Sequence, residues 1–534
     1  TLHRFQKQLK AARLFDAGRP QVGYGFARSR AASRRASRIV PAGAGVEVAV
    51  MYEPLEIASG ASITDRGWQR DVADGAVRVS PEQALEMLKR MPLHSLGRLA
   101  DARARAVHGD TYRTYVIDRN INYTNVCTAK CTFCAFRRDG DDHDAYTLEV
   151  EQILEKIGEL SDIGGTQILM QGGMNPELPL DWYLNLLRTI KERYPHIHVH
   201  AFSPPEFIEF VNFFDPPGAT LEAKIEWVMV RLREAGLDSL PGGGGEIFAD
   251  AVRRKIGLGK CTADAWLTCM YVAHKLGMFT SATMMFGHIE GLADRVHHML
   301  EVRRWQDRTL TETARQEAVG GGTMGHYKAF ISWPFQRENT PLGRLREWGD
   351  DPQGRPDEIV EPFPGDVVAK LDGSGEKSAH AEFGRRLRMS GATEYLRTQA
   401  VSRLVLDNVY SIGASWVTMG PHVGQLGLKY GANDMGSVMM EENVVSSAGT
   451  TYCLNEAVLC RLIRDAGFTP AQRDNVYDVV QVHAGVEAPD RQVSDWSRHR
   501  AKKLHVQNDA GEGEGPTDGT PIELKVSAAG AGAD

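Results

Sequence analysis

The chain has 534 residues, of which 42% are hydrophobic and 25% charged, a composition typical of a globular protein with one large domain and extensions. The formal net charge of -7 gives no basic field for a nucleic-acid partner, and no apolar run is long enough to span a membrane. The seven cysteines follow no disulfide framework, which favours a reducing compartment such as the bacterial cytoplasm.

Residues 1–50 form a basic, acid-poor segment, in which ten Lys or Arg precede Glu47 against a single acidic residue. Such a composition resembles an organellar transit peptide, which would place the protein in an organelle. We favour a second interpretation, in which the segment is upstream sequence translated from a misplaced start and Met51 is the true beginning. It shows no sustained amphipathic pattern, and the chain does not begin with Met.

Residues 80–113 predict a helical N-terminal extension with two helices between 80 and about 106. Ser80 is suited to cap the first helix, with Pro81 at its first position. The alternating β-branched and aromatic residues from Thr114 to Tyr123 then predict a strand.

Directly after this strand, Cys127, Cys131 and Cys134 form a C-x-x-x-C-x-x-C array. Zinc sites usually need four ligands, and no fourth partner follows at a zinc-like spacing. Three cysteines holding an iron-sulfur cube would leave one iron open for chemistry. A zinc knuckle or a buried cysteine cluster on a non-catalytic, partner-binding scaffold is the alternative. Apolar neighbours such as Phe133 would favour burial, which helps to set the potential of an iron-sulfur cluster.

Seven further strands are expected, each preceded by a helical pattern, at 166–170, 196–202, 237–240, 280–286, 327–333, 412–417 and 432–436. Eight alternating strands and helices predict an α/β fold, a closed (βα)8 TIM-type barrel spanning 114–480. Residues 308–326 and 347–390 are expected to be surface insertions, and the low-complexity acidic tail at 502–534 to be disordered.

Active-site residues of such barrels lie in the loops that follow the strands. After the second strand, Gln171, Gly172 and Gly173 form a turn whose backbone can approach a ligand carboxylate. After the third, Ser203 and Glu206 are candidates for holding a polar ligand. His196, His198 and His200 share one face of this strand, where hydrogen-bonded core histidines are commoner than a metal site.

The later strand ends add four candidates. Glu246 follows a glycine run that lacks the lysine of a P-loop, so nucleotide hydrolysis is not expected. Its carboxylate could accept from a hydroxyl or ammonium group, or it could equally be a carboxylate at the N-terminus of a helix. His288 could be a general base and Arg337 could bind a substrate carboxylate, or either residue could instead be structural. Asp434 adds a carboxylate near the barrel mouth.

The cysteine array resembles the signature of the radical S-adenosylmethionine (SAM) superfamily, which implies one 4Fe-4S cluster whose open iron binds SAM. The turn of Gln171, Gly172 and Gly173 resembles the superfamily's binding turn for the amino-acid end of SAM. Phe133, Ser203 and Glu206 are expected from their positions to lie around the same cofactor. INYTNVC, LMQGGMNPELP, HAFSPPE, LDSLPGGGGEI, AFISWPFQRENTPL, GANDMG and GFTPAQRD, between about 80 and 477, further resemble the cyclic dehypoxanthine futalosine synthase family of menaquinone biosynthesis.

This resemblance implies that a 5′-deoxyadenosyl radical abstracts hydrogen from C4′ of the ribose of dehypoxanthine futalosine, and that the carbon radical closes onto the benzoate-bearing ring. It implies Arg337 and Glu246 as substrate-binding residues, His288 or Asp434 as proton acceptor, and an electron donor such as flavodoxin or ferredoxin. Aminofutalosine synthase and the deazaflavin-forming synthase subunit that uses tyrosine are the alternatives within the superfamily.

Overall fold

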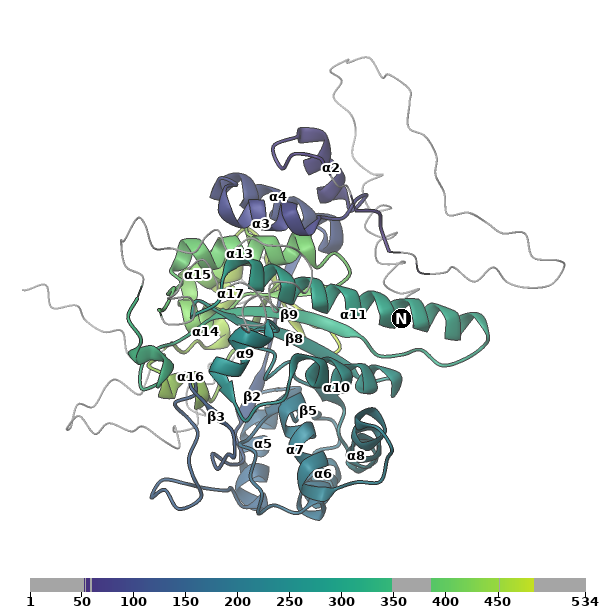
Figure 1. Ribbon diagram of the computed structural model, residues 1–534, viewed down its shortest axis with the longest axis vertical. Helices are drawn as coiled ribbons and strands as arrows, with labels where there is room; N and C mark the ends of the chain where they lie inside the picture. Colours follow the sequence, from purple (N-terminus) through teal and green to yellow (C-terminus); the bar gives the residue numbers. More distant parts are fainter. Residues whose placement is uncertain (1–51, 53, 58–59, 348–385, 451, 485–534) are drawn as a thin grey trace, which may run out of the picture.

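The computed structural model describes residues 52, 54–57, 60–347, 386–450 and 452–484, shown as ribbon in Figure 1. The expectations for residues 1–50, for Met51, for most of 347–390 and for 502–534 lie outside the described residues.

A parallel β-sheet forms the centre of the fold and follows the predicted order of strands. The sheet runs β1-β11-β10-β9-β8-β6-β5-β4-β2, and β1 and β2 are consecutive parts of the extended segment 112–121. Because β1 pairs with β11 and β2 pairs with β4, the sheet closes on itself along this segment, which confirms the barrel. The strands are β1 Tyr112–Val116, β2 Asp118–Ile121, β4 Gln167–Met170, β5 His198–Ala201, β6 Ser239–Leu240, β8 Phe279–Phe286, β9 Tyr327–Pro334, β10 Ser411–Gly413 and β11 Asp434–Ser437.

Two strands that the sequence did not predict extend the sheet beside β1. β12 (Thr469–Arg473) runs parallel to β1, with Tyr112 opposite Thr469, and β13 (Val479–Val482) pairs antiparallel with β12. The segment 112–121 therefore has β12 along its first half and β4 along its second half. This arrangement places the β12–β13 hairpin beside β1, at the end of the barrel where the segment 112–121 begins.

Helices cover the outside of the barrel (Figure 1), and several of them bury an apolar stripe. In α5 (Val150–Asp162), for example, Ile153, Leu154, Ile157 and Leu160 are buried at helical spacing. The other covering helices are α6 Leu180–Arg193, α7 Pro204–Phe214, α8 Leu221–Ala235, α10 Ala263–Lys275, α11 Leu292–Ala318, α13 Ala392–Val405, α15 Pro421–Gly427 and α17 Glu456–Asp465. Short elements are α9 Asp250–Ile256, η1 Leu342–Arg344, α14 Trp416–Met419 and α16 Val444–Ser447.

Helix α11 corrects the expectation of a surface insertion at 308–326. The helix continues to Ala318 and projects past the barrel in Figure 1, so only the residues after it form a loop. Thr309, Leu310, Thr313 and Ala314 are buried at helical spacing, which explains why this stretch stays helical. The polar residues between them had concealed this periodicity.

The N-terminal extension contains the two predicted helices, α3 (Pro81–Lys89) and α4 (Leu93–His108), and an additional helix, α2 (Arg66–Asp74). Ser80 caps α3 in a reciprocal capping box with Gln83. The three helices lie at one end of the molecule (Figure 1), where α3 packs on α11 and α4 on α13. The extension is thus an integral part of the fold.

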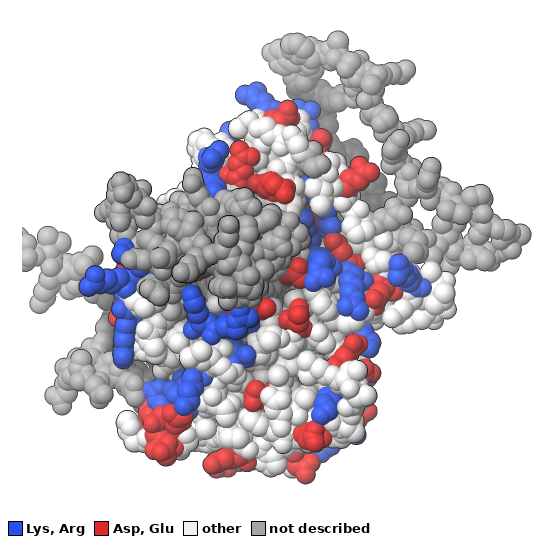
Figure 2. All heavy atoms as spheres, viewed as in Figure 1, with Lys and Arg blue, Asp and Glu red and all other residues white. Residues whose placement is uncertain are grey.

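On the face in Figure 2, Lys and Arg are interspersed with Asp and Glu among the described residues. Within the described ranges, no helix combines the length and apolar character needed to cross a membrane.

Candidate functional site

The barrel interior contains a cavity of about 480 Å³. It extends from the cysteine loop, at the carboxyl ends of the strands, to the β12–β13 hairpin. Polar side chains from most strands of the barrel line it, among them Asp118, Asn120, Gln167, Gln171, His200, Ser239, Glu246, Thr283, Asp434 and Arg473. A cavity of this size, polar in part and enclosed by the sheet, is suited to a small-molecule ligand.

The three cysteines lie together at the mouth of this cavity. Cys131 belongs to β3 (Lys130–Cys131), which pairs antiparallel with β7 (Gly257–Leu258), and Cys127 and Cys134 pack in the same small cluster. The Cys134 amide donates to the Cys131 carbonyl over 3.2 Å. The backbone of the loop therefore holds the thiols where the sequence predicts them.

Burial raises the pKa of the Cys127 thiol, and hydrogen bonds from the backbone of Met174 and Ala129 partly offset this effect. Burial likewise raises the pKa of Cys131 to about 12. Free thiols at these positions would stay protonated at neutral pH, whereas coordination to a metal displaces the proton.

The thiols fit the separate irons of a cluster better than a single ion. Within the described ranges, no three His, Cys, Asp or Glu side chains converge on one ion position, as a mononuclear zinc site would require. Three thiols with backbone donors, in an apolar pocket beside Phe133 and Met174, form the donor set that an iron-sulfur cube uses.

The Gly172–Gly173 turn passes directly under the cysteine loop. The Gly173 amide donates to the Thr124 carbonyl over 2.8 Å, and a Cβ on Gly173 would lie 2.0 Å from the Val126 carbonyl oxygen. A Cβ on Gly172 would lie 2.5 Å from the ring of Tyr123. Only glycine allows this close approach of the turn to the loop.

Ser203 and Glu206 line the cavity, but their hydrogen bonds are made within the protein. They form the capping box of α7, in which Glu206 Oε2 accepts from the Ser203 amide and hydroxyl, each over 2.7 Å. Glu206 Oε1 accepts from Tyr123 Oη over 2.7 Å and from the Gly172 amide over 3.2 Å. This buried carboxylate therefore ties the loops after β4 and β5 together.

Glu246 forms an ion pair inside the cavity with Lys260, which the sequence did not single out. Lys260 Nζ lies 2.8 Å from Glu246 Oε1 and 4.9 Å from the centre of the Phe133 ring. Burial opposes the charge on Lys260, but Glu246 and Cys131 offset this and raise its pKa. A cation and an anion thus stand side by side next to the cysteine loop.

His288 does not line the cavity, which is contrary to its expected role as a general base. Its side chain is fully buried behind β8, with Nδ1 3.1 Å from Glu290 Oε2. Burial lowers its pKa, although Glu290 works in the opposite direction. His288 therefore has a structural position. It lies in the turn after β8, where the alternation of side chains between the two faces of a strand no longer determines which way a residue points.

Arg337 also lies outside the cavity, so the structure does not support its expected contact with a substrate carboxylate. Its Nη2 donates to the Gly343 carbonyl over 2.6 Å, and its Nη1 pairs with Glu347. Arg337 therefore holds the turn that contains η1.

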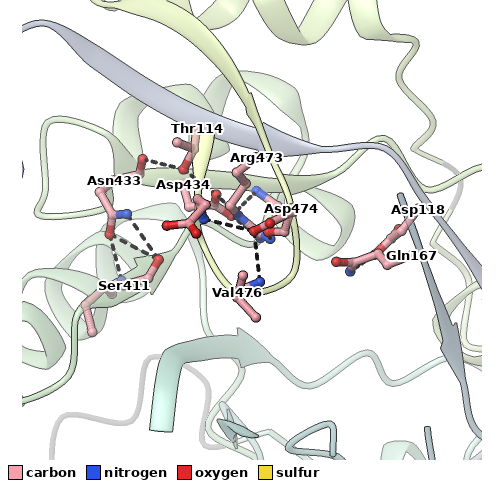
Figure 3. Close-up of polar contacts among 12 residues, drawn as sticks. Thr114, Asp118, Gln167, Ser411, Asn433, Asp434, Arg473, Asp474 and Val476 are labelled. Atoms are coloured by element: carbon pink, nitrogen blue, oxygen red, sulfur yellow. Dashed lines mark hydrogen bonds and ion pairs between the residues drawn. The ribbon is translucent and has the colours of Figure 1, made fainter. Parts of the chain in front are cut away.

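Asp434 lines the cavity but is fully engaged by neighbours (Figure 3). Arg473 donates to both of its oxygens, over 2.5 and 2.9 Å, while Thr114 Oγ1 and the Gly436 amide supply one further bond each. Donors of the protein thus occupy about all four acceptor positions of the carboxylate. This arrangement makes Asp434 an anchor of the cavity wall and leaves little capacity for accepting a proton from a ligand.

The histidines of β5 form a hydrogen-bonded group centred on Ser239. Its hydroxyl lies 2.7 Å from His198 Nε2, 2.6 Å from His200 Nδ1 and 2.8 Å from Asn475 Nδ2. His196 is separate and contacts Ser161 at the surface. The contacts of His198 and His200 agree with the expectation that histidines of this strand are hydrogen-bonded within the core.

Reasoning from the sequence missed several charged cavity residues, among them Asp118, Lys260 and Arg473. The position of Asp118 could have been predicted, because polar residues recur at every second position of the first strand, at 118, 120 and 122, and therefore share one face. Lys260 and Arg473 reach the cavity from elements outside the predicted strands, and only Arg473 lies in a family motif, GFTPAQRD, which did not show that its side chain faces the cavity.

Family models match two parts of the chain: the radical SAM superfamily at residues 121–302, and the CofH/MqnC C-terminal region at residues 381–486. The chain is 38% identical over 414 residues to the cyclic dehypoxanthine futalosine synthase of Halalkalibacterium halodurans, covering 78% of this chain and 95% of that relative. It is 36% identical over 374 residues to the 5-amino-6-(D-ribitylamino)uracil–L-tyrosine 4-hydroxyphenyl transferase of Methanopyrus kandleri, covering 69% and 85%.

The fold is similar to that of a solved methylornithine synthase, with a TM-score of 0.50 at 16% identity, over 76% of this chain and 97% of that one. At this identity the likeness concerns the fold alone.

Proposed function

The chain belongs to the radical SAM superfamily, in the family that contains the cyclic dehypoxanthine futalosine synthases, and we propose that it converts dehypoxanthine futalosine to its cyclic product in menaquinone biosynthesis. The observation that carries the proposal is the position of the cysteine loop, which opens into one cavity together with the glycine turn and the Lys260–Glu246 pair.

Cys127, Cys131 and Cys134 would hold the 4Fe-4S cluster. When bound, the cluster and SAM together supply the 5′-deoxyadenosyl radical that abstracts hydrogen from C4′ of the substrate ribose. The chain keeps the three thiols in an apolar pocket and directs backbone N–H groups at Cys127, which favours the thiolate.

The amino-acid end of SAM carries a carboxylate and an ammonium group, which match the neighbouring charges of Lys260 and Glu246. Gln171, Gly172 and Gly173 bring a backbone turn to the same place, and Phe133 provides an apolar surface. Ser203 and Glu206 support this site by holding the strand-end loops in register. We therefore reassign Glu246 from the substrate to this end of the cofactor.

The remaining cavity, toward the β12–β13 hairpin, would receive the substrate. The closed sheet excludes water and stray hydrogen donors, and it can hold the sugar close to the radical source. We propose a reduced flavodoxin or ferredoxin as the electron donor. The seven cysteines follow no disulfide framework in the sequence, which supports a reducing, cytoplasmic location.

The similarity to the tyrosine-using transferase makes a coupling reaction the second candidate. Cyclisation removes two hydrogens without adding a partner, whereas the transferase activity, like that of aminofutalosine synthase, joins two molecules. The two reaction types therefore give products of different mass.

The test is an anaerobic reaction of reconstituted protein with SAM, a reductant and dehypoxanthine futalosine, followed by mass spectrometry. We expect 5′-deoxyadenosine and a product two hydrogens lighter than the substrate. Formation of 5′-deoxyadenosine without this product would leave the radical chemistry intact but refute the substrate. A coupled product from tyrosine would favour the second candidate.

A further inference from the structure

Two buried carbonyl oxygens in the cavity wall have no hydrogen-bond partner among the described residues: Asn120 Oδ1 and Gln167 Oε1. The side chains are 5% and 4% exposed. Within the described ranges, no other cavity-lining residue has such an unpaired buried atom. A buried acceptor without a donor costs about 1–3 kcal/mol, so this pair indicates a ligand that supplies donors.

The orientation of both amides follows from their nitrogen atoms. Gln167 Nε2 donates to Asp118 Oδ2 over 2.9 Å, and Asn120 Nδ2 donates to Glu442 Oε2 over 3.2 Å. Because each nitrogen faces a carboxylate, each free end is the carbonyl oxygen, and a flipped amide would place two acceptors together. The cavity therefore presents two acceptors here.

Asp118 adds further acceptor capacity beside Gln167. It lies directly opposite Gln167 in the sheet and shares its face of β2 with Asn120 (Figure 3 shows Asp118 beside Gln167). Its oxygens accept from Ser437 Oγ and Gln167 Nε2, which leaves about two of its four acceptor positions.

Asp118 has no basic side chain as a direct ion-pair partner among the described residues. No Lys or Arg in the described part of the chain forms a salt bridge with it. Burial raises its pKa, while its two hydrogen bonds and the more distant Arg473 work in the opposite direction. Asp434, the other nearby carboxylate, is already paired with Arg473. A ligand carboxylate or phosphate would meet only acceptors at this wall.

We propose that Asp118, Asn120 and Gln167 form a subsite for ribose hydroxyl groups. Hydroxyls are the donors that such a wall selects, and a sugar presents several of them from one ring. Both the substrate and SAM contain a ribose. We assign the subsite to the substrate because the three residues lie within the strands, below the loops that hold the cysteines and the glycine turn.

This assignment rests on the proposed function and deepens it, because it orients the substrate. The sugar lies against the β2–β4 wall, and the benzoate carboxylate points away from it. The reacting C4′ then belongs to the part of the substrate that the protein holds most firmly.

The experiment compares Asn120→Leu and Gln167→Leu with a matched control, Gln472→Leu. Gln472 is also a buried glutamine of the sheet, but it lies outside the cavity and donates to the Gly164 carbonyl over 3.3 Å. The dissociation constants of dehypoxanthine futalosine, of analogues lacking one ribose hydroxyl, and of SAM are measured on reconstituted protein by calorimetry.

We expect the wild type to bind at least one deoxy analogue about tenfold more weakly than the substrate. Each cavity variant should bind the substrate about tenfold more weakly and lose most of this discrimination, while Gln472→Leu retains it. Equal affinity of the wild type for all analogues, a measurement that needs no variant, would overturn the subsite. A variant that weakens SAM alone would overturn its assignment to the substrate. If the wild type fails to bind dehypoxanthine futalosine, the proposed function itself fails.

Discussion

Replacing Gly173 by alanine tests whether the glycine turn positions the cysteine loop. The added Cβ would lie 2.0 Å from the Val126 carbonyl oxygen and 3.0 Å from Cys127 Cβ. Ordinary C···O contacts are about 3.3 Å, so the turn and the loop must separate by roughly 1 Å. The loop cannot yield without cost, because the Thr128 amide also bonds to the Met174 carbonyl, over 3.0 Å.

Overpacking of this kind typically costs about 1–3 kcal/mol, and here the strain falls on the residue before Cys127. We expect Gly173→Ala to bind less than about half the iron and sulfide of the wild type after anaerobic reconstitution, with a matching loss of visible absorbance. Gly322→Ala is the matched control, because its Cβ would meet nothing within 4 Å. Equal iron content in the two variants would refute the reasoning.

Three further predictions concern buried charges. Asp434→Asn and Arg473→Met should each lower the free energy of unfolding in urea by about 3–5 kcal/mol, and the double variant by clearly less than their sum; additive losses would contradict a coupled ion pair. Burial raises the pKa of Asp294 to about 7 from 3.8, so its contribution to stability is complete below pH 3.8 and is lost as the pH rises toward 7. Asp294→Asn should therefore flatten the fall in urea midpoint between pH 5 and 7.5, and an unchanged fall would argue against this carboxyl. Lys260→Met should weaken SAM binding about tenfold in calorimetry, and unchanged affinity would remove Lys260 from the cofactor site.

Local sequence patterns were sufficient to predict the barrel and the cysteine loop. Apolar stripes at helical spacing and short buried strands recur along the chain, and the rule that sites follow strand ends located the glycine turn and Glu246. That rule gives the position of a loop but not the direction of each side chain in it. His288 and Arg337 lie in such loops and point away from the cavity.

The part of the cavity next to the β12–β13 hairpin depends on pairing between segments that are distant in the sequence. β12 is a strand because it lies beside β1, and its sequence, TPAQR, has little strand character of its own. Arg473 reaches Asp434 only through that pairing. By contrast, the polar alternation through Asp118 and Asn120 was present in the sequence, and its interior position became clear only when the barrel closed.

The central claim is that this cavity directs a 5′-deoxyadenosyl radical to C4′ of the substrate sugar. The most direct measurement uses dehypoxanthine futalosine with deuterium at C4′ and follows the label by mass spectrometry. We predict that 5′-deoxyadenosine gains one deuterium and that the cyclic product contains none at that carbon. Unlabelled 5′-deoxyadenosine, formed together with a product that retains the deuterium, would contradict the account.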